Sequence, residues 1–193
     1  PSASRVAIWS SNSKDWPIVD LAIMLAGHVS VPLYPGQDAD SAGYILSHSD
    51  SKMVFLGSFD AWGKAAEVMP ESLPRVAMLG AQVPCLTSLE QILKDYQPWL
   101  ESPVPAPESM FTIIYTSGTT GNPKGVMHTH ATPGYVCPDL AAGLRHEVGN
   151  TRFFSYLPMS HAAERILVEL ASLYCNGCIS FSEGLATFAE ELH

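Results

Sequence analysis

Hydrophobic positions in the first hundred residues follow two alternating patterns. Short apolar runs rich in β-branched and aromatic residues predict strands, and stretches with apolar positions at helical spacing predict helices. The predicted strands span residues 6–9, 31–34, 52–56 and 75–79, and the predicted helices span 15–26, 40–48, 59–68 and 86–96. Strands that alternate with helices in this way are typical of an α/β fold with a mostly parallel sheet.

A proline-rich segment interrupts this alternation. Four prolines fall within residues 98–107, and such a stretch forms neither a helix nor a central strand. We interpret residues 98–109 as a linker between a first α/β subdomain, 1–97, and a second, incomplete one, 110–193, which contains a phosphate-binding loop described below. In the second subdomain the pattern predicts strands at 111–115, 153–157 and 178–181 and a helix at 161–174.

The composition indicates a folded protein with an acidic surface. Hydrophobic residues make up 47% of the chain, and 19 acidic against 10 basic residues leave a net charge of −9. This balance disfavours nucleic acid and anionic membranes as main partners. The longest apolar run, 18–26, contains Asp20 and is far shorter than the roughly 20 residues that a membrane span needs, so no transmembrane segment is expected.

Four scattered cysteines fit a reducing, cytoplasmic compartment better than a disulfide framework. Cys175 and Cys178 have C-x-x-C spacing, but a zinc site needs two further ligands and a redox site needs a thioredoxin-like context. We therefore interpret the pair as a turn at a helix end, in which Gly177 supplies the reversal of the chain.

The segment 116–125 has the chemistry of a phosphate-binding loop. It directly follows the predicted strand 111–115 and combines three glycines with four hydroxyl residues. Backbone N–H groups and hydroxyls in such a turn can hold phosphate oxygens, and glycines allow the close approach. Lys124 is the only cation of the sequence between Lys94 and Arg145, so its natural partner is a phosphate. The spacing matches neither the P-loop pattern nor the G-x-G-x-x-G fingerprint.

Two motifs resemble those of a known superfamily. Residues 115–126, Tyr-Thr-Ser-Gly-Thr-Thr-Gly-Asn-Pro-Lys-Gly-Val, resemble the phosphate-binding signature of the AMP-forming, adenylate-forming enzymes, which include acyl-CoA synthetases, luciferases and adenylation domains of nonribosomal peptide synthetases. Residues 155–165 are similar to the next motif in its long-chain fatty acyl-CoA synthetase form, L-P-x-x-H-x-x-E-R. The resemblance implies the N-terminal part of the acetyl-CoA synthetase-like fold, α/β with mostly parallel sheets flanked by helices.

The resemblance also implies a reaction. In this superfamily a carboxylate attacks the α-phosphorus of ATP, pyrophosphate leaves, and in the acyl-CoA synthetases the thiol of coenzyme A then captures the acyl-adenylate. Charge develops on the phosphates, so positioning and electrostatic stabilisation dominate. The implied nucleotide-binding residues are Thr116, Ser117, Gly118, Thr119, Thr120, Gly121 and Lys124.

Individual roles follow from the same resemblance. Lys124 would neutralise the leaving pyrophosphate, the Thr116 hydroxyl would contact Mg²⁺, and His161 would orient the acyl substrate or the thiol. Two alternatives stay open at this point: Thr116 bonding only to backbone, and His161 acting as a hydrogen-bonding residue at a helix N-terminus. Glu164 and Arg165 are expected to form an exposed ion pair that fixes the helix behind His161.

Other parts of the machinery have no counterpart in the sequence, which contains neither Y-x-x-T-E nor Y-x-T-G-D. We therefore expect an N-terminal fragment, inactive alone, of an ATP-dependent, AMP-forming long-chain fatty acid–CoA ligase whose partners are a fatty acid, ATP, Mg²⁺ and coenzyme A. Peripheral contact with a membrane is compatible with a long-chain acid. The alternatives are another adenylate former, such as an aryl-CoA ligase or an amino-acid adenylation domain, and a truncated, non-catalytic nucleotide-binding protein.

Overall fold

The computed structural model describes residues 3–58, 62–83, 87–101, 104–116, 121–184 and 187–191. The strands are β1 (Arg5–Trp9), β2 (Val29–Leu33), β3 (Ser51–Leu56), β4 (Arg75–Ala77), β5 (Thr87–Ser88), β6 (Met110–Thr116), β7 (Lys124–Thr129), β8 (Arg152–Ser155) and β9 (Cys178–Phe181). The helices are α1 (Asp15–Leu25), α2 (Ala39–His48), α3 (Trp62–Val68), α4 (Leu89–Asp95), α5 (Ala131–Gly143), α6 (Ala162–Glu164), the π-helix η1 (Arg165–Leu170), α7 (Ala171–Cys175) and α8 (Phe188–Glu191).

Two sheets organise the described part of the chain. The larger has the strand order β5-β4-β3-β1-β2-β6-β7 and is parallel except for β7, which runs antiparallel to β6, while β8 and β9 form a separate parallel pair. The predicted α/β fold with mostly parallel sheets is therefore confirmed. The larger sheet takes strands from both sides of the proline-rich segment, and the division of the chain into 1–97 and 110–193 stays a prediction.

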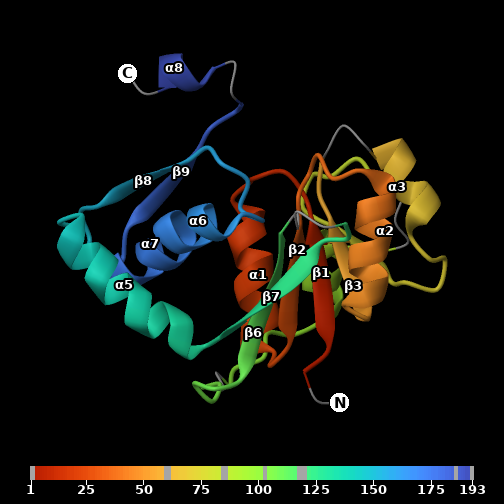
Figure 1. The fold of residues 1–193 in the computed structure, drawn as a ribbon, viewed down its shortest axis with the longest axis horizontal. Helices are drawn as coiled ribbons and strands as arrows, with labels where there is room; N and C mark the ends of the chain where they lie inside the picture. The colour runs from red at the N-terminus through yellow and green to blue at the C-terminus, as the bar shows by residue number, and fades with distance from the viewer. Residues whose placement is uncertain are drawn as a thin grey trace.

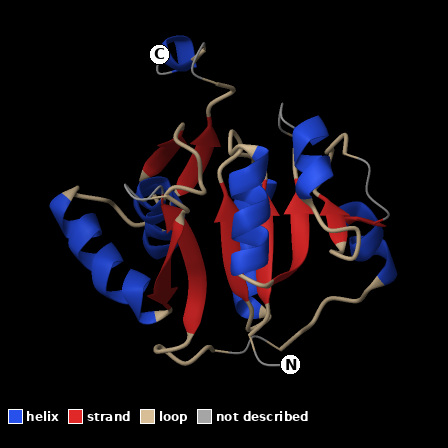
Figure 2. Cartoon of the chain, turned by 45° about the vertical axis from the view of Figure 1, so that its right-hand side comes forward, coloured by secondary structure: helices blue, strands red, loops and turns tan. Residues whose placement is uncertain are grey.

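Both faces of the larger sheet are covered, as its continuous apolar strands require. Alternate residues of β1 enter different cores: Ala7 and Trp9 pack with α2, whereas Val6 and Ile8 pack with α1 and with the unit that contains β8. Figure 1 shows α2 and α3 on one side of the sheet and α1, α6 and α7 on the other. Figure 2 is turned so that the right-hand side of Figure 1 comes forward, and it shows helix in front of the near face of the large sheet.

Strand β7 and helix α5 are among the elements that were not predicted. Strand β7 is largely exposed and lacks a regular alternation of apolar and polar residues, so its sequence carries little strand signal. Helix α5 contains Pro138 and two glycines, which disfavour a helix. It forms because it packs against η1 and α7 and buries Cys137, which is a tertiary effect that local propensity does not contain.

The turn after α7 corrects the expectation for Gly177. The left-handed residue that ends the helix is Asn176, with φ 51° and ψ 44°. Gly177 is needed for a different reason, because a Cβ there would lie 2.6 Å from Cε2 of Phe153 and 2.8 Å from the carbonyl oxygen of Thr151. Cys178 is exposed and Cys175 is buried, and both are free thiols.

Within the described residues, no helix is both long and apolar enough to cross a membrane.

Candidate active site

A cavity of about 540 Å³ opens at the carboxyl ends of the parallel strands β2 and β6. This edge of an α/β sheet is where ligands are usually bound. Its walls come from the turn after β2, the first turn of α2, the end of β6 and the segment that enters α6. The lining residues are Pro32, Tyr34, Gln37, Asp38, Ser41, Ile45, Ile114, Tyr115, Thr116, Gly121, Pro123, Ser160, His161 and Ala162.

Three of the predicted site residues line this one cavity: Thr116, Gly121 and His161. Lys124 is exposed and begins β7, where it pairs with Thr116 across the β6–β7 ladder. Among the described residues it forms no ion pair with a carboxylate. The remaining predicted phosphate contacts, Ser117, Gly118, Thr119 and Thr120, lie outside the described residues.

The segment predicted to bind phosphate, 116–125, connects β6 to β7, which run antiparallel. Gly121 adopts a φ of +122°, which L side chains rarely tolerate. Gly125 is required for a different reason, because a Cβ there would lie 2.7 Å from Cγ2 of Ile113 and 3.2 Å from Cζ of Tyr115. The glycines at 121 and 125 therefore serve the hairpin itself.

His161 lies in extended backbone as the N-cap of α6. Its Nδ1 accepts a hydrogen bond from the backbone N–H of Ala163 at 3.2 Å. In the neutral ring the proton is then on Nε2, which is a donor. His161 thus caps a helix and lines the cavity, so the two roles considered for it are not exclusive.

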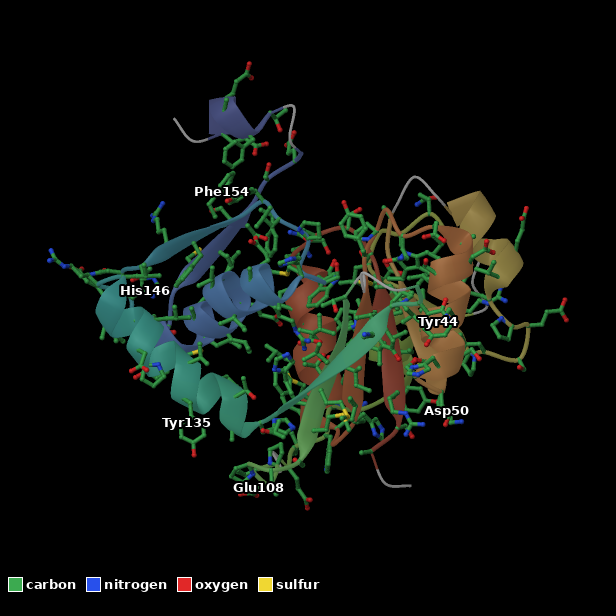
Figure 3. All side chains as sticks on the ribbon, in the orientation of Figure 1. Tyr44, Asp50, Glu108, Tyr135, His146 and Phe154 are labelled. Atoms are coloured by element: carbon green, nitrogen blue, oxygen red, sulfur yellow. The ribbon has the colours of Figure 1, made fainter. Side chains whose placement is uncertain are left out.

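The other walls of the cavity are held by hydrogen bonds that sequence reasoning missed. Asp38 caps α2 by accepting from the backbone N–H of Ser41 at 2.9 Å, and this bond at a helix N-terminus lowers the pKa of its carboxyl. The hydroxyl of Tyr115 lies 2.8 Å from Nδ1 of His48, and burial raises the pKa of this phenol. His48 also stacks on Tyr44 in α2, which Figure 3 labels.

Glu164 and Arg165 do not form the exposed pair that was expected, because both are buried and face different partners. Glu164 Oε1 accepts from the backbone N–H of Tyr156 at 3.0 Å, and burial raises the pKa of this carboxyl. Arg165 pairs instead with Asp20 of α1 at 2.5 Å, and its Nε lies 3.5 Å from Glu169 in its own helix, η1.

The guanidinium of Arg165 has two further polar partners on the large sheet. It donates to the hydroxyls of Ser30 in β2 and Thr112 in β6. Its Cζ lies over the rings of Trp16 and Phe111, at 5.8 and 5.2 Å from their centroids. Residues of α1, β2 and β6 thereby fix the helix that begins next to His161.

Within the described residues there is no group of three His, Cys, Asp or Glu side chains that could hold a metal ion. Mg²⁺ on a nucleotide usually takes only one or two protein oxygens beside phosphates and water, so the Thr116 hydroxyl at the cavity wall fits such a role.

Family comparison decides the class of protein. The AMP-binding enzyme family matches residues 2–193. The chain belongs to the AMP-binding enzymes. Among curated members, fatty acyl-CoA synthetase A of Dictyostelium discoideum is 30% identical over 94% of this chain, and human long-chain-fatty-acid–CoA ligase 1 is 27% identical over 93%. The chain spans 29% and 28% of the lengths of these two relatives.

Solved structures show the same fold. The N-terminal domain of FACL13 from Mycobacterium tuberculosis, with a bound inhibitor, superposes with a TM-score of 0.77 at 24% identity and covers 99% of this chain and 47% of that one. VinN in complex with L-aspartate gives 0.79 at 20% identity, with 99% and 46% covered. At these identities the likeness establishes the fold.

Proposed function

We propose that this chain is part of an AMP-forming long-chain fatty acid–CoA ligase. It binds the phosphates of ATP, forms one wall of the acyl pocket, and is inactive alone. The observation that carries the proposal is the single cavity lined by Thr116, Gly121 and His161, at whose edge Lys124 begins β7. The long-chain preference is supported by the names of the curated relatives.

The residues of the β6–β7 connection would share the work on ATP. Backbone N–H groups and hydroxyls of residues 117–120 would hold the β- and γ-phosphates, and the Thr116 hydroxyl would contact the Mg²⁺ that accompanies them. Lys124, exposed and opposite Thr116, would neutralise the pyrophosphate as it leaves. Such charge stabilisation contributes most where charge develops during the reaction.

His161 would serve the acyl side of the same cavity. Its Nδ1 is engaged by the N–H of Ala163, so Nε2–H is the group left to orient a carboxylate or acyl-adenylate oxygen. Coenzyme A would be the second acceptor of the acyl group. A cytoplasmic location, with peripheral contact to membranes that hold the acid, belongs to the same proposal.

The test is acid-dependent exchange of labelled pyrophosphate into ATP by the protein read through to its natural stop codon. The acids are hexadecanoate, octanoate, benzoate and a set of amino acids. We expect hexadecanoate to drive exchange best, and Lys124→Ala to lower the rate by about 10- to 1000-fold, the usual cost of removing one electrostatic stabiliser of a transition state.

Lys94→Ala is the matched control, because Lys94 is exposed on α4 and is not among the residues that line the cavity. It should exchange at the wild-type rate. Preference for another acid would keep adenylation and discard the long-chain substrate. If none of the acids drives exchange, the proposed enzyme activity is wrong. Thioester formation by the 193-residue chain alone would contradict the proposal that the chain is inactive by itself.

A further inference from the structure

The segment from Tyr156 to His161 connects β8 to α6 without regular secondary structure, yet it carries the candidate acyl-binding histidine. A side chain from the opposite end of the sequence holds it. The amide of Asn12, in the loop after β1, donates to Oγ of Ser155 at 2.9 Å and to the carbonyl oxygen of Leu157 at 2.6 Å. Its Oδ1 accepts from the backbone N–H of Met159 at 2.8 Å.

The partners fix the orientation of this amide. The carbonyl of Leu157 can only accept a hydrogen bond, and the N–H of Met159 can only donate one. A side-chain amide can donate on one side and accept on the other within a single plane. A carboxylate at position 12 would lose the donors, and a hydroxyl would be too short to reach all three partners.

Residues of the connection between β8 and α6 line two cavities. Ser160 and His161 line the 540 Å³ cavity. Tyr156 and Pro158 line a second one of about 280 Å³, together with Asn12. The position of this connection therefore affects the shape of both cavities.

We propose that Asn12 is a positioning residue for His161: its amide sets the segment 155–159, and so determines where the imidazole stands in the cavity. The second anchor is Glu164, which accepts from Tyr156 N–H and so ties the start of the segment to α6. Asn12 itself touches no reacting group in this scheme. The role in turnover rests on the proposed function, whereas the placement of His161 does not.

The kinetic test compares Asn12→Ala, His161→Ala and the double variant in the protein read through to its natural stop codon, with hexadecanoate. We expect Asn12→Ala to lower kcat for adenylation by about 10- to 100-fold, since a displacement near 1 Å can cost that much, with KM for ATP within about threefold of wild type. If Asn12 acts through His161, adding Asn12→Ala to His161→Ala should lower kcat only slightly further. Losses that multiply in the double variant would overturn the proposal.

Two further variants separate a change in kcat from a loss of folding: one preserves the shape of the side chain at position 12, and the other removes an amide elsewhere. Asn12→Asp keeps the shape and the acceptor for Met159 N–H but removes both donors, and we expect it to lose activity in the same direction; wild-type kcat in this variant would contradict the inference. Asn150→Ala removes an exposed amide near β8 and should leave kcat unchanged.

A readout independent of activity is the ¹H–¹³C NMR resonance of the His161 Cε1–H, assigned by its absence in His161→Ala. We expect Asn12→Ala and Asn12→Asp to move this resonance and to leave that of His28, immediately before β2, in place. An unmoved His161 resonance would overturn the proposal. If the wild-type protein shows no exchange with any acid, the proposed enzyme activity fails, and the NMR result still decides the placement by Asn12.

Discussion

At the scale of single residues, the buried group around Arg165 carries more carboxyls than guanidinium groups. Asp20 and Glu169 both approach Arg165, and the side chains of all three are almost fully buried. Burial, and then the negative charge of Asp20, raise the pKa of Glu169 well above its ordinary value. A protonated Glu169 leaves the group neutral, which is the least costly arrangement away from water.

This protonation predicts a pH dependence of stability. The folded chain retains a proton on Glu169 that the unfolded chain releases above pH 4.5, so the unfolding free energy falls as the pH rises above this value, by up to about 1.4 kcal/mol per pH unit. Glu169→Gln reproduces the neutral acid without the titration. In urea unfolding, the unfolding free energy of the variant should therefore be close to that of the wild type at pH 5 and higher than that of the wild type at pH 8.

The comparison needs a control for the loss of one acidic residue. Glu108→Gln, at an exposed position labelled in Figure 3, should follow the wild-type pH profile. If the unfolding free energies of wild type and Glu169→Gln changed in parallel with pH, Glu169 would be ionised in the folded chain.

At the scale of elements, the turn between α7 and β9 depends on close packing at one glycine. Gly177→Ala would place a Cβ against the ring of Phe153 and the carbonyl of Thr151, both in or next to β8. We expect a loss of about 1–3 kcal/mol of unfolding free energy, as for other overpacked sites. Urea unfolding measures this directly.

Gly134→Ala provides the matched substitution. Gly134 lies in α5 and has open space around its Cα, so alanine there should stabilise the chain by up to about 1 kcal/mol through helix propensity. Equal effects of the two substitutions would mean that the backbone at 177 moves freely and that the contact with Phe153 does not limit it.

At the scale of the whole molecule, Arg165 joins η1 to the large sheet and to α1 through polar contacts. Its guanidinium reaches Asp20 of α1, Ser30 of β2 and Thr112 of β6. Apolar packing also joins this part of the chain to the large sheet, because Met159, Val168 and Ala171 pack on residues of β1 and α1. The helix that starts next to His161 is thus positioned by the large sheet.

Arg165→Met should cost about 3–5 kcal/mol of unfolding free energy, because it leaves Asp20 buried without a cation. Arg152→Met, at the exposed first residue of β8, should change the unfolding free energy by less than about 0.5 kcal/mol. Urea unfolding of both variants at pH 7 checks the difference. Similar stabilities for the two would exclude a structural role for the buried pair.

The sequence by itself determined the α/β class and most strand and helix positions, because these depend on local periodicity and on residues that are neighbours in the chain. The phosphate-binding role of residues 116–125 stays a prediction. The sequence missed strand β7 and helix α5, whose stability comes from packing against other elements. It also misassigned Arg165, since nothing near position 165 indicates that its partner is Asp20. Only the tertiary structure brought Asn12 to the segment 155–159, because hydrogen bonds between residues more than 140 positions apart leave no periodic trace in a sequence.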